Sequence, residues 1–197
     1  MVGLSISVSD SAALGSLEGF KPGAIKRIQR EGNNTTARQA AKKAASIGKK
    51  LAGLTQLGDA QKMVGARYAG KGSTQASVRI SHRPMNLIRF VAGQKPPKRR
   101  PRVGVKAKPY GKPRVHRGAF FMPLKGKGSG RWAVMKRSGR ERLPIEPLFG
   151  PSLYQIFKDD SEAHRELERF IAERHPINMR RAIDRERRAQ QRGINRR

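Results

Sequence analysis

The chain has 197 residues, and its 44 basic and 14 acidic side chains give a formal net charge of +30. This length suits one domain with extended arms, while a hydrophobic fraction of only 36% indicates that part of the apolar surface is covered by partners. The absence of cysteine excludes disulfides, thiolate metal sites and a cysteine nucleophile, and no apolar run approaches the roughly 20 residues of a membrane span.

The positive charge is concentrated in the middle of the chain. Residues 60–140 contain 22 basic side chains and no acidic one, whereas residues 141–197 contain thirteen and ten. A solvated helical face normally pairs acidic with basic residues four apart, and this zone has no acid for such pairing. The pattern therefore favours a surface that binds a negatively charged partner over a role in solubility alone.

The first twenty residues lack the basic start of a secretory leader, so we expect an intracellular protein.

The first 73 residues are expected to be helical. Apolar residues within 20–31 recur at helical spacing, and the polar residues 33–36 predict a turn and N-cap. An alanine-rich second helix should then span 37–51. Asp59 is expected to cap a third, short helix that continues through Tyr68.

Residues 74–157 are expected to form an antiparallel β core. Strict alternation over 74–81 predicts a half-buried strand, and 103–106 a second one. The apolar segment 85–91 has no clear type. The proline-rich basic segment 95–102 predicts an extended arm.

A long hairpin should follow a basic loop at 110–117. The most apolar run, 118–124, predicts a core strand, 125–130 a glycine-rich tip and 131–137 the returning strand. Three prolines in 143–152 exclude a regular helix, and four large apolar residues there predict a buried strap.

The C-terminal region, 158–197, is expected to be a helix and a basic tail. A helical stripe begins after Ser152, is capped again at 159–161, stops at Pro176 and resumes after Asn178, and the tail begins at Arg185. The fold class is therefore α+β: N-terminal helices (1–73), a central antiparallel sheet with a long hairpin (74–157), and a C-terminal helix with extended basic arms (158–197).

No catalytic, cofactor-binding or metal-binding residue is expected. The four histidines (His82, His116, His164 and His175) lack metal-ligand spacing and are expected at surface or cap positions. The acids within 162–173 alternate with arginines and predict a salt-bridged helix face. The glycines of 126–130 join two predicted strands, so they do not form a phosphate loop. We expect no enzymatic activity.

An ordered series of short segments resembles a known family. The segments are 85–90 (MNLIRF), 103–106 (VGVK), 118–121 (GAFF), 132–137 (WAVMKR) and 142–152 (RLPIEPLFGPS). Their order and spacing resemble the prophage minor tail protein Z family over residues 74–157. The motif residues are Gly118, Phe120, Trp132, Arg142, Leu143, Pro144, Ile145, Gly150 and Pro151.

The resemblance implies a structural virion protein of a long-tailed bacteriophage, without enzymatic activity or cofactor. It implies tail completion at the head-proximal end, or neck, with a role in tail assembly and head–tail joining. A homo-oligomeric ring is expected, a hexamer because tail tubes are six-fold, in contact with tail terminator, tail tube or head–tail connector proteins.

The arms are expected to reach these partners. The contact residues are Lys95, Lys98, Arg99, Arg100, Arg102, Lys125, Lys127, Arg187, Arg188 and Arg192. The alternative is a nucleic-acid-binding protein of ribosomal or architectural type, and contact with genomic DNA stays open. The aromatic residues are not spaced as a stacking platform, which weighs against this alternative. A membrane-surface binder has the least support.

Overall fold

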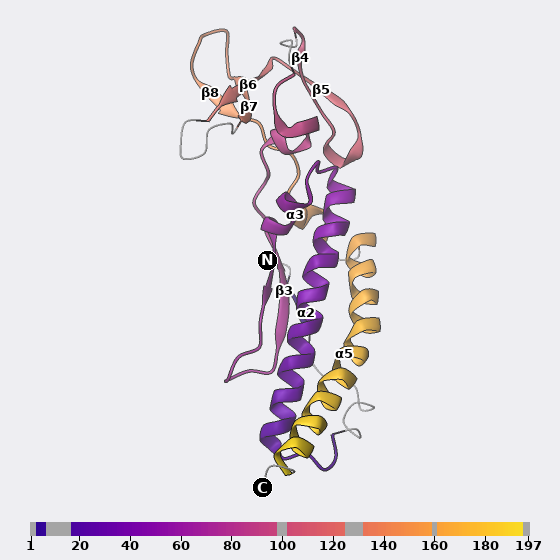
Figure 1. Ribbon diagram of the computed structural model, residues 1–197. Helices are drawn as coiled ribbons and strands as arrows, with labels where there is room; N and C mark the ends of the chain where they lie inside the picture. The colour runs from indigo at the N-terminus through magenta and orange to yellow at the C-terminus, as the bar shows by residue number, and fades with distance from the viewer. Residues whose placement is uncertain (1–2, 7–16, 98–101, 125–131, 159–160, 195–197) are drawn as a thin grey trace. The chain divides into compact units, whose positions relative to one another are not determined.

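The computed structural model describes residues 3–6, 17–97, 102–124, 132–158 and 161–194 (Figure 1). The chain divides into two compact units. Unit 1 comprises Met1–Ala44, Val64–Ile80 and Asp159–Arg197, and unit 2 comprises Ala45–Met63 and Ser81–Lys158. Helices and small antiparallel sheets occur together, which confirms the α+β class.

Unit 1 is built on two long helices that run side by side (Figure 1). They are α5 (Glu162–Ile194) and the part of α2 (Pro22–Ala52) that ends at Ala44. One apolar cluster between them comprises Leu17, Ile28, Met179, Ala182 and Ile183. Gly32 permits close approach, because a Cβ atom there would lie 2.2 Å from the Met179 Sδ.

The predicted turn at 33–36 is wrong, because α2 continues through it. Its polar side chains, which usually cap helices, bond to other segments instead. Asn33 Nδ2 donates to the Thr74 carbonyl at 2.6 Å, and Asn33 Oδ1 lies 2.9 Å from His175 Nε2. Asn34 bonds both the N–H and the C=O of Ala69, at 2.6 and 3.2 Å. Tertiary partners thus outweigh the local preference for a helix end.

A three-stranded antiparallel sheet completes unit 1, in the order β1 (Gly3–Ile6), β3 (Ala76–Ile80), β2 (Val64–Arg67). The alternation predicted for β3 is confirmed, since Ala76, Val78 and Ile80 are buried. The helix expected through Tyr68 is wrong. Helix α3 (Leu57–Met63), in unit 2, ends where β2 begins, because Val64 and Ala66 pair with β3.

The predicted break at Pro176 is also wrong, since α5 includes it and extends to Ile194. Pro176 and Ala172 are both exposed, so the carbonyl that loses its helical partner lies on the solvent side. Beside the proline, His175 contacts Asn33, and Asn178 Nδ2 donates to Thr36 Oγ1 at 3.0 Å. Most of the predicted basic tail is therefore helical.

Unit 2 contains two small antiparallel sheets. Strand β4 (Gly104–Ala107) pairs with β5 (Arg114–Arg117), and the second sheet has the order β6 (Ala119–Pro123), β7 (Trp132–Arg137), β8 (Ile145–Pro147). The β6–β7 hairpin and the strand at 103–106 are thereby confirmed, whereas the expected basic loop contains β5. Short helices complete the unit: η1 (Leu87–Phe90), η2 (Ala92–Gln94), η3 (Pro109–Gly111) and α4 (Leu153–Ile156).

The core of unit 2 lies around η1, whose Leu87, Ile88 and Phe90 are buried. Asn86, just before η1, fastens it to the hairpin, because its Oδ1 accepts from Val134 N at 3.0 Å and from Ile88 N at 3.1 Å. The unassigned segment 85–91 is therefore the centre of the unit.

Two predictions of burial in unit 2 are wrong. In β6 only Ala119 is fully buried, and Phe120, Phe121 and Met122 are half-buried. In the predicted strap, Leu143 is 67% and Phe149 is 54% exposed. The strap forms β8 at the edge of its sheet, so its side chains are not enclosed on both faces. Apolar surface therefore remains uncovered.

Among the residues that the structure describes, no helix is both long and apolar enough to cross a membrane.

Candidate binding surface

Positive charge differs sharply between the two units. Unit 2 contains 23 basic and three acidic residues, and unit 1 contains 21 and eleven. Of the three acids in unit 2, Asp59 is buried and pairs with Arg89, while Glu141 and Glu146 are exposed. Unit 2 therefore has very little internal compensation for its charge.

Several acidic residues of unit 1 form ion pairs that join its two long helices. Lys43 Nζ lies 2.7 Å from Glu166 Oε1, and Arg27 and Arg185 of opposite helices pair with Glu186 and Glu31. On the helix face predicted to be salt-bridged, Glu166 thus pairs with Lys43 of α2, and Glu168 Oε1 lies 3.1 Å from His164 Nε2. His175, expected at a surface or cap position, is instead buried within α5 against Asn33, because α2 and α5 pack together there.

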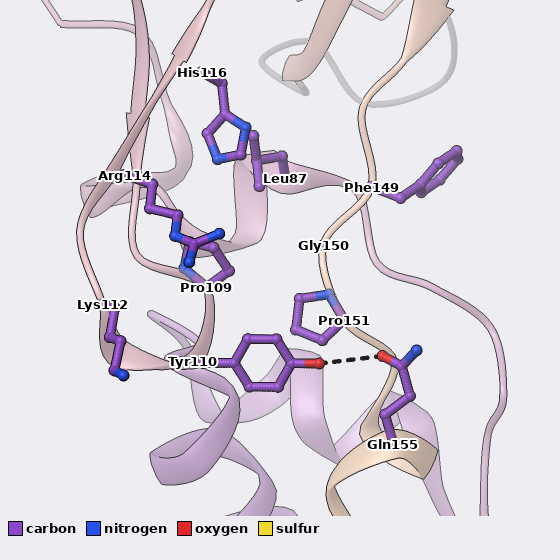
Figure 2. Close-up of a pocket in the computed structure, with 10 residues that line it drawn as sticks. All are labelled: Leu87, Pro109, Tyr110, Lys112, Arg114, His116, Phe149, Gly150, Pro151 and Gln155. Carbon is purple, nitrogen blue, oxygen red and sulfur yellow. Dashed lines mark hydrogen bonds between the residues drawn. The ribbon is translucent and has the colours of Figure 1, made fainter.

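A cleft opens in unit 2 between β5, the η3 loop and the segment that follows β8 (Figure 2). It has a volume of about 410 Å³. None of its ten lining residues is acidic: Leu87, Pro109, Tyr110, Lys112, Arg114, His116, Phe149, Gly150, Pro151 and Gln155.

The wall formed by residues 149–151 is held by backbone hydrogen bonds. Leu148 N donates to Val134 O at 3.0 Å, and Gly150 N donates to Met85 O at 2.8 Å. A Cβ atom at Gly150 would lie 2.5 Å from the ring of the buried Phe90, so only glycine lets the chain approach this closely. This wall is therefore fixed on the core of the unit.

Tyr110 forms the opposite end of the cleft. Its φ of +55° lies in the left-handed region, which a non-glycine residue adopts only when its surroundings impose it. Tyr110 Oη donates to Gln155 Oε1 at 3.3 Å (Figure 2), and the same oxygen accepts from Ser152 N at 3.3 Å. The capping box of α4 thus positions the tyrosine.

His116 contributes a polar side chain to the lining of the cleft. It shares a face of the β4–β5 sheet with the buried Val105, and its Nε2 is buried without a hydrogen-bond partner among the described residues. Burial, and then the nearby Arg114 guanidinium, lower the pKa of His116 below its usual value of 6.5. The imidazole is therefore neutral at pH 7, and Lys112 and Arg114 supply the positive charge of the rim.

The cleft combines an apolar lining, a basic rim and one unpaired polar atom. Such a site can enclose an apolar side chain, donate a hydrogen bond to a carbonyl or carboxylate, and attract negative charge. No group of three or more histidine, aspartate or glutamate side chains suited to a metal ion occurs in the described parts of the chain.

The predicted contact residues do not converge on this cleft. Lys95 and Arg102 are exposed in unit 2, and Lys95 lines a separate hollow with Lys106, Lys108 and Phe121. Three more, Arg187, Arg188 and Arg192, are exposed on α5 of unit 1. The remaining five lie outside the described residues: Lys98, Arg99, Arg100, Lys125 and Lys127.

The motif residues have varied positions in unit 2. Gly150 and Pro151 line the cleft, and Gly118 turns the chain between β5 and β6 with a φ of +71°. Phe120 lies beneath the Arg137 guanidinium, 5.6 Å from its ring centroid. Trp132 and Ile145 are half-buried in β7 and β8, and the other three are exposed: Arg142, Leu143 and Pro144.

Tyr110, Lys112, Arg114 and His116 are the cleft residues that the sequence analysis missed. They were assigned to a basic loop, although Arg114 and His116 alternate with Val115 and so carry a weak strand signal. No local pattern indicates that residues 149–151 lie opposite them.

The fold and this surface define a class of protein: a basic α+β chain whose second unit has exposed apolar and positively charged side chains. The family model for prophage minor tail protein Z (GPZ) matches residues 10–192, and the chain belongs to this family. It is therefore a structural protein of a phage tail, carried in the virion. The match extends well beyond the residues that carry the resemblance. No curated protein and no solved structure matches the chain.

Proposed function

We propose that the chain is a tail-completion subunit at the head-proximal end of the tail, where it finishes the tail and joins it to the head. The observation that carries this proposal is the makeup of unit 2, whose sequence holds 23 basic and only three acidic residues and whose described part exposes large apolar side chains. Repulsion between these charges destabilises an isolated subunit, and partners that cover the surface stabilise it. This suits a junction between several proteins.

The subunit forms a closed homo-oligomeric ring, a hexamer that matches the six-fold tail tube. Eight large apolar side chains in the described part of unit 2 are more than a third exposed, and neighbouring copies would cover those that lie outside the cleft. The eight are Leu51, Leu57, Val103, Tyr110, Val115, Leu124, Leu143 and Phe149.

The role is structural and not enzymatic, and the further partners are acidic proteins: a tail terminator, the tail tube or a head–tail connector. Opposite charge steers such partners together and offsets the repulsion within unit 2. These contacts weaken with salt wherever they stay exposed to solvent.

Deletion of the gene from the phage genome tests this function. We expect filled heads and separate tails of normal length in electron micrographs of the lysate, and intact particles when the gene is supplied in trans. Cryo-electron microscopy of intact particles should place a six-fold ring of this chain at the neck. Loss of tails altogether, or density at the distal tip, would contradict the proposal.

Contact with genomic DNA is a second candidate, favoured by the exposed arginines of α5. Arg187, Arg188 and Arg192 lie on its C-terminal half, and unrelated duplex DNA should bind there with an affinity that falls steeply between 0.05 and roughly 0.3 M salt. Replacing the three with glutamine should flatten that salt dependence. An unchanged slope would exclude α5 as the contact.

A further inference from the structure

We propose that the cleft between Tyr110, His116 and Pro151 is the docking site for an extended segment of another protein, in which an apolar side chain is flanked by carboxylates. The inference deepens the proposed function, because it states where an acidic partner binds. It can nevertheless be tested on the purified chain alone.

The lining of the cleft suits one apolar side chain. Pro109, Pro151 and the ring of Tyr110 line the cleft together with Leu87, which is fully buried and lies beside His116 (Figure 2). Its volume of about 410 Å³ is within the range of pockets that bind ligands, roughly 300–1,000 Å³. The cleft is therefore large enough for a leucine or phenylalanine side chain with part of its backbone.

The unpaired Nε2 of His116 indicates a polar ligand atom. Buried polar atoms nearly always have a hydrogen-bond partner, and one without a partner destabilises the protein. Figure 2 shows His116 and Arg114 along the same side of the cleft, opposite Pro151. A backbone carbonyl or carboxylate of a bound segment can accept a hydrogen bond from this nitrogen.

The positive charges around the cleft favour a ligand with carboxylates on either side of its apolar side chain. Lys112 and Arg114 are exposed at the rim, and no acid lines the cleft. Carboxylates beside the apolar side chain would lie near these two cations. Duplex DNA fits poorly, because its phosphate backbone offers no apolar group to fill the lining made by Pro109, Tyr110 and Pro151.

A second copy of the chain is also a poor source of the segment. Its densest acidic stretch, at 159–162, directly follows Phe157 and Lys158, and Phe157 is fully buried in unit 2. The acids of α5 alternate with arginines. The charge complement must therefore come from a different protein.

The backbone around the cleft is held in place by close contacts, and the His116 ring, whose Nε2 has almost no exposed surface, must turn toward a ligand. Gly53 lies against the η3 loop, since a Cβ atom there would be 2.2 Å from the Lys108 carbonyl oxygen, and Gly150 lies against Phe90. A rigid site loses little conformational freedom on binding, which leaves more of the contact energy for affinity.

Fluorescence anisotropy with synthetic peptides tests the inference. The probe is a fluorescein-labelled decapeptide with a central phenylalanine flanked by alternating glutamate and serine. One control peptide has glutamine for glutamate, and another has alanine for phenylalanine. We expect the probe to bind at least tenfold more tightly than either control at 0.15 M NaCl, because charge and apolar contact are both required.

Matched variants locate the site. The double change Lys112→Glu and Arg114→Glu should weaken binding at least tenfold, whereas Arg83→Glu with Arg140→Glu, at exposed positions of the same unit outside the cleft, should weaken it less than threefold. His116→Leu should weaken binding while raising the thermal midpoint, because it removes both a ligand contact and a buried unpaired nitrogen. A residue with only a structural role would not separate these two effects.

Crosslinking gives the second readout. With benzophenylalanine at the central position, the probe should modify residues within 109–116 or 149–155. Equal weakening by both double variants, equal binding of a control peptide, or crosslinks confined elsewhere would each overturn the inference. Because no virion is involved, failure here leaves the neck assignment intact, and a misplaced ring leaves peptide binding intact.

Discussion

Gly53 decides how the η3 loop packs in unit 2. Its φ is +75°, and a Cβ atom would lie 2.2 Å from Lys108 O and 2.5 Å from Gly111 N, both backbone atoms that cannot move alone. We expect Gly53→Ala to lower the free energy of unfolding by about 2–4 kcal/mol, through backbone strain and overpacking. Thermal unfolding measures the change.

The matched control is Gly58→Ala. Nothing lies within 4 Å of a Cβ atom at Gly58, which belongs to helix α3. Alanine is the better helix former by up to about 1 kcal/mol, so this variant should be at least as stable as the parent. If the two variants behave alike, the close approach at Gly53 does not limit stability.

The lowered pKa of His116 links stability to pH. Burial and Arg114 disfavour the imidazolium in the folded state, so below pH 6.5 the unfolded state binds more protons than the folded state. The contribution of His116 is complete above pH 6.5 and is lost as pH falls through the folded pKa. The thermal midpoint should therefore fall on acidification from pH 7.5 to 5.5.

Two variants separate the causes of this pH dependence. His116→Gln should show the smaller fall of the midpoint over the same window, because it removes the titrating group. Arg114→Gln should be intermediate, since burial, the larger cause, remains. A fall as steep in His116→Gln as in the parent would assign the effect to other groups.

Among the elements, α2 shows how tertiary contacts override local preference. The Asn34 side chain makes two hydrogen bonds to the backbone of Ala69, just beyond β2. We expect Asn34→Ala to destabilise the chain by about 1–2 kcal/mol, even though alanine favours the helix by roughly 0.5 kcal/mol. Urea denaturation followed by circular dichroism gives the value.

Ser46→Ala is the control within the same helix. Ser46 is exposed, so alanine there should leave stability unchanged or slightly higher. A comparable loss in both variants would mean that the contacts of Asn34 do not hold β2 to the helix.

Strands β3, β6 and β7 were predicted from the sequence, whereas β1 and β2 lie in the region that was expected to be helical. The alternation of β3 and the hairpin of β6 and β7 depend on local periodicity, which the sequence displays directly. Breaks predicted from single residues failed. Asn33 and Pro176 usually interrupt helices, yet partners 142 residues apart, such as Asn33 and His175, keep both helices continuous.

The cleft could not be predicted from local sequence patterns, again because contacts between distant residues form it. Its walls come from residues 109–116 and 149–155, and hydrogen bonds through Met85 and Val134 bring the second wall into place. Only the resemblance pointed toward Gly150 and Pro151, and it did so as motif residues. What selects glycine at 150 is the Phe90 ring, which no pattern around either residue reveals.

For the whole molecule, the imbalance of charge determines how stability responds to salt. Screening shortens the range of repulsion from about 10 Å at 0.1 M to about 3 Å at 1 M ionic strength. Unit 2, with 23 basic and three acidic residues, should become more stable as salt screens this repulsion. Unit 1 should gain less stability, because salt screens the attraction within its ion pairs, such as Lys43 with Glu166, as well as the repulsion between like charges.

Hydrogen–deuterium exchange read by mass spectrometry at 0.1 and 1 M NaCl tests this difference. Amide protection should rise more over 81–97, 102–124 and 132–158 than over 22–44 and 161–192. In a variant with Lys95, Lys106 and Lys108 changed to glutamine, the gain in unit 2 should shrink, since the three exposed lysines no longer repel one another. An equal rise in both units would show that salt acts by strengthening the burial of apolar surface in general. In that case the charge of unit 2 would not explain why the isolated subunit depends on its partners.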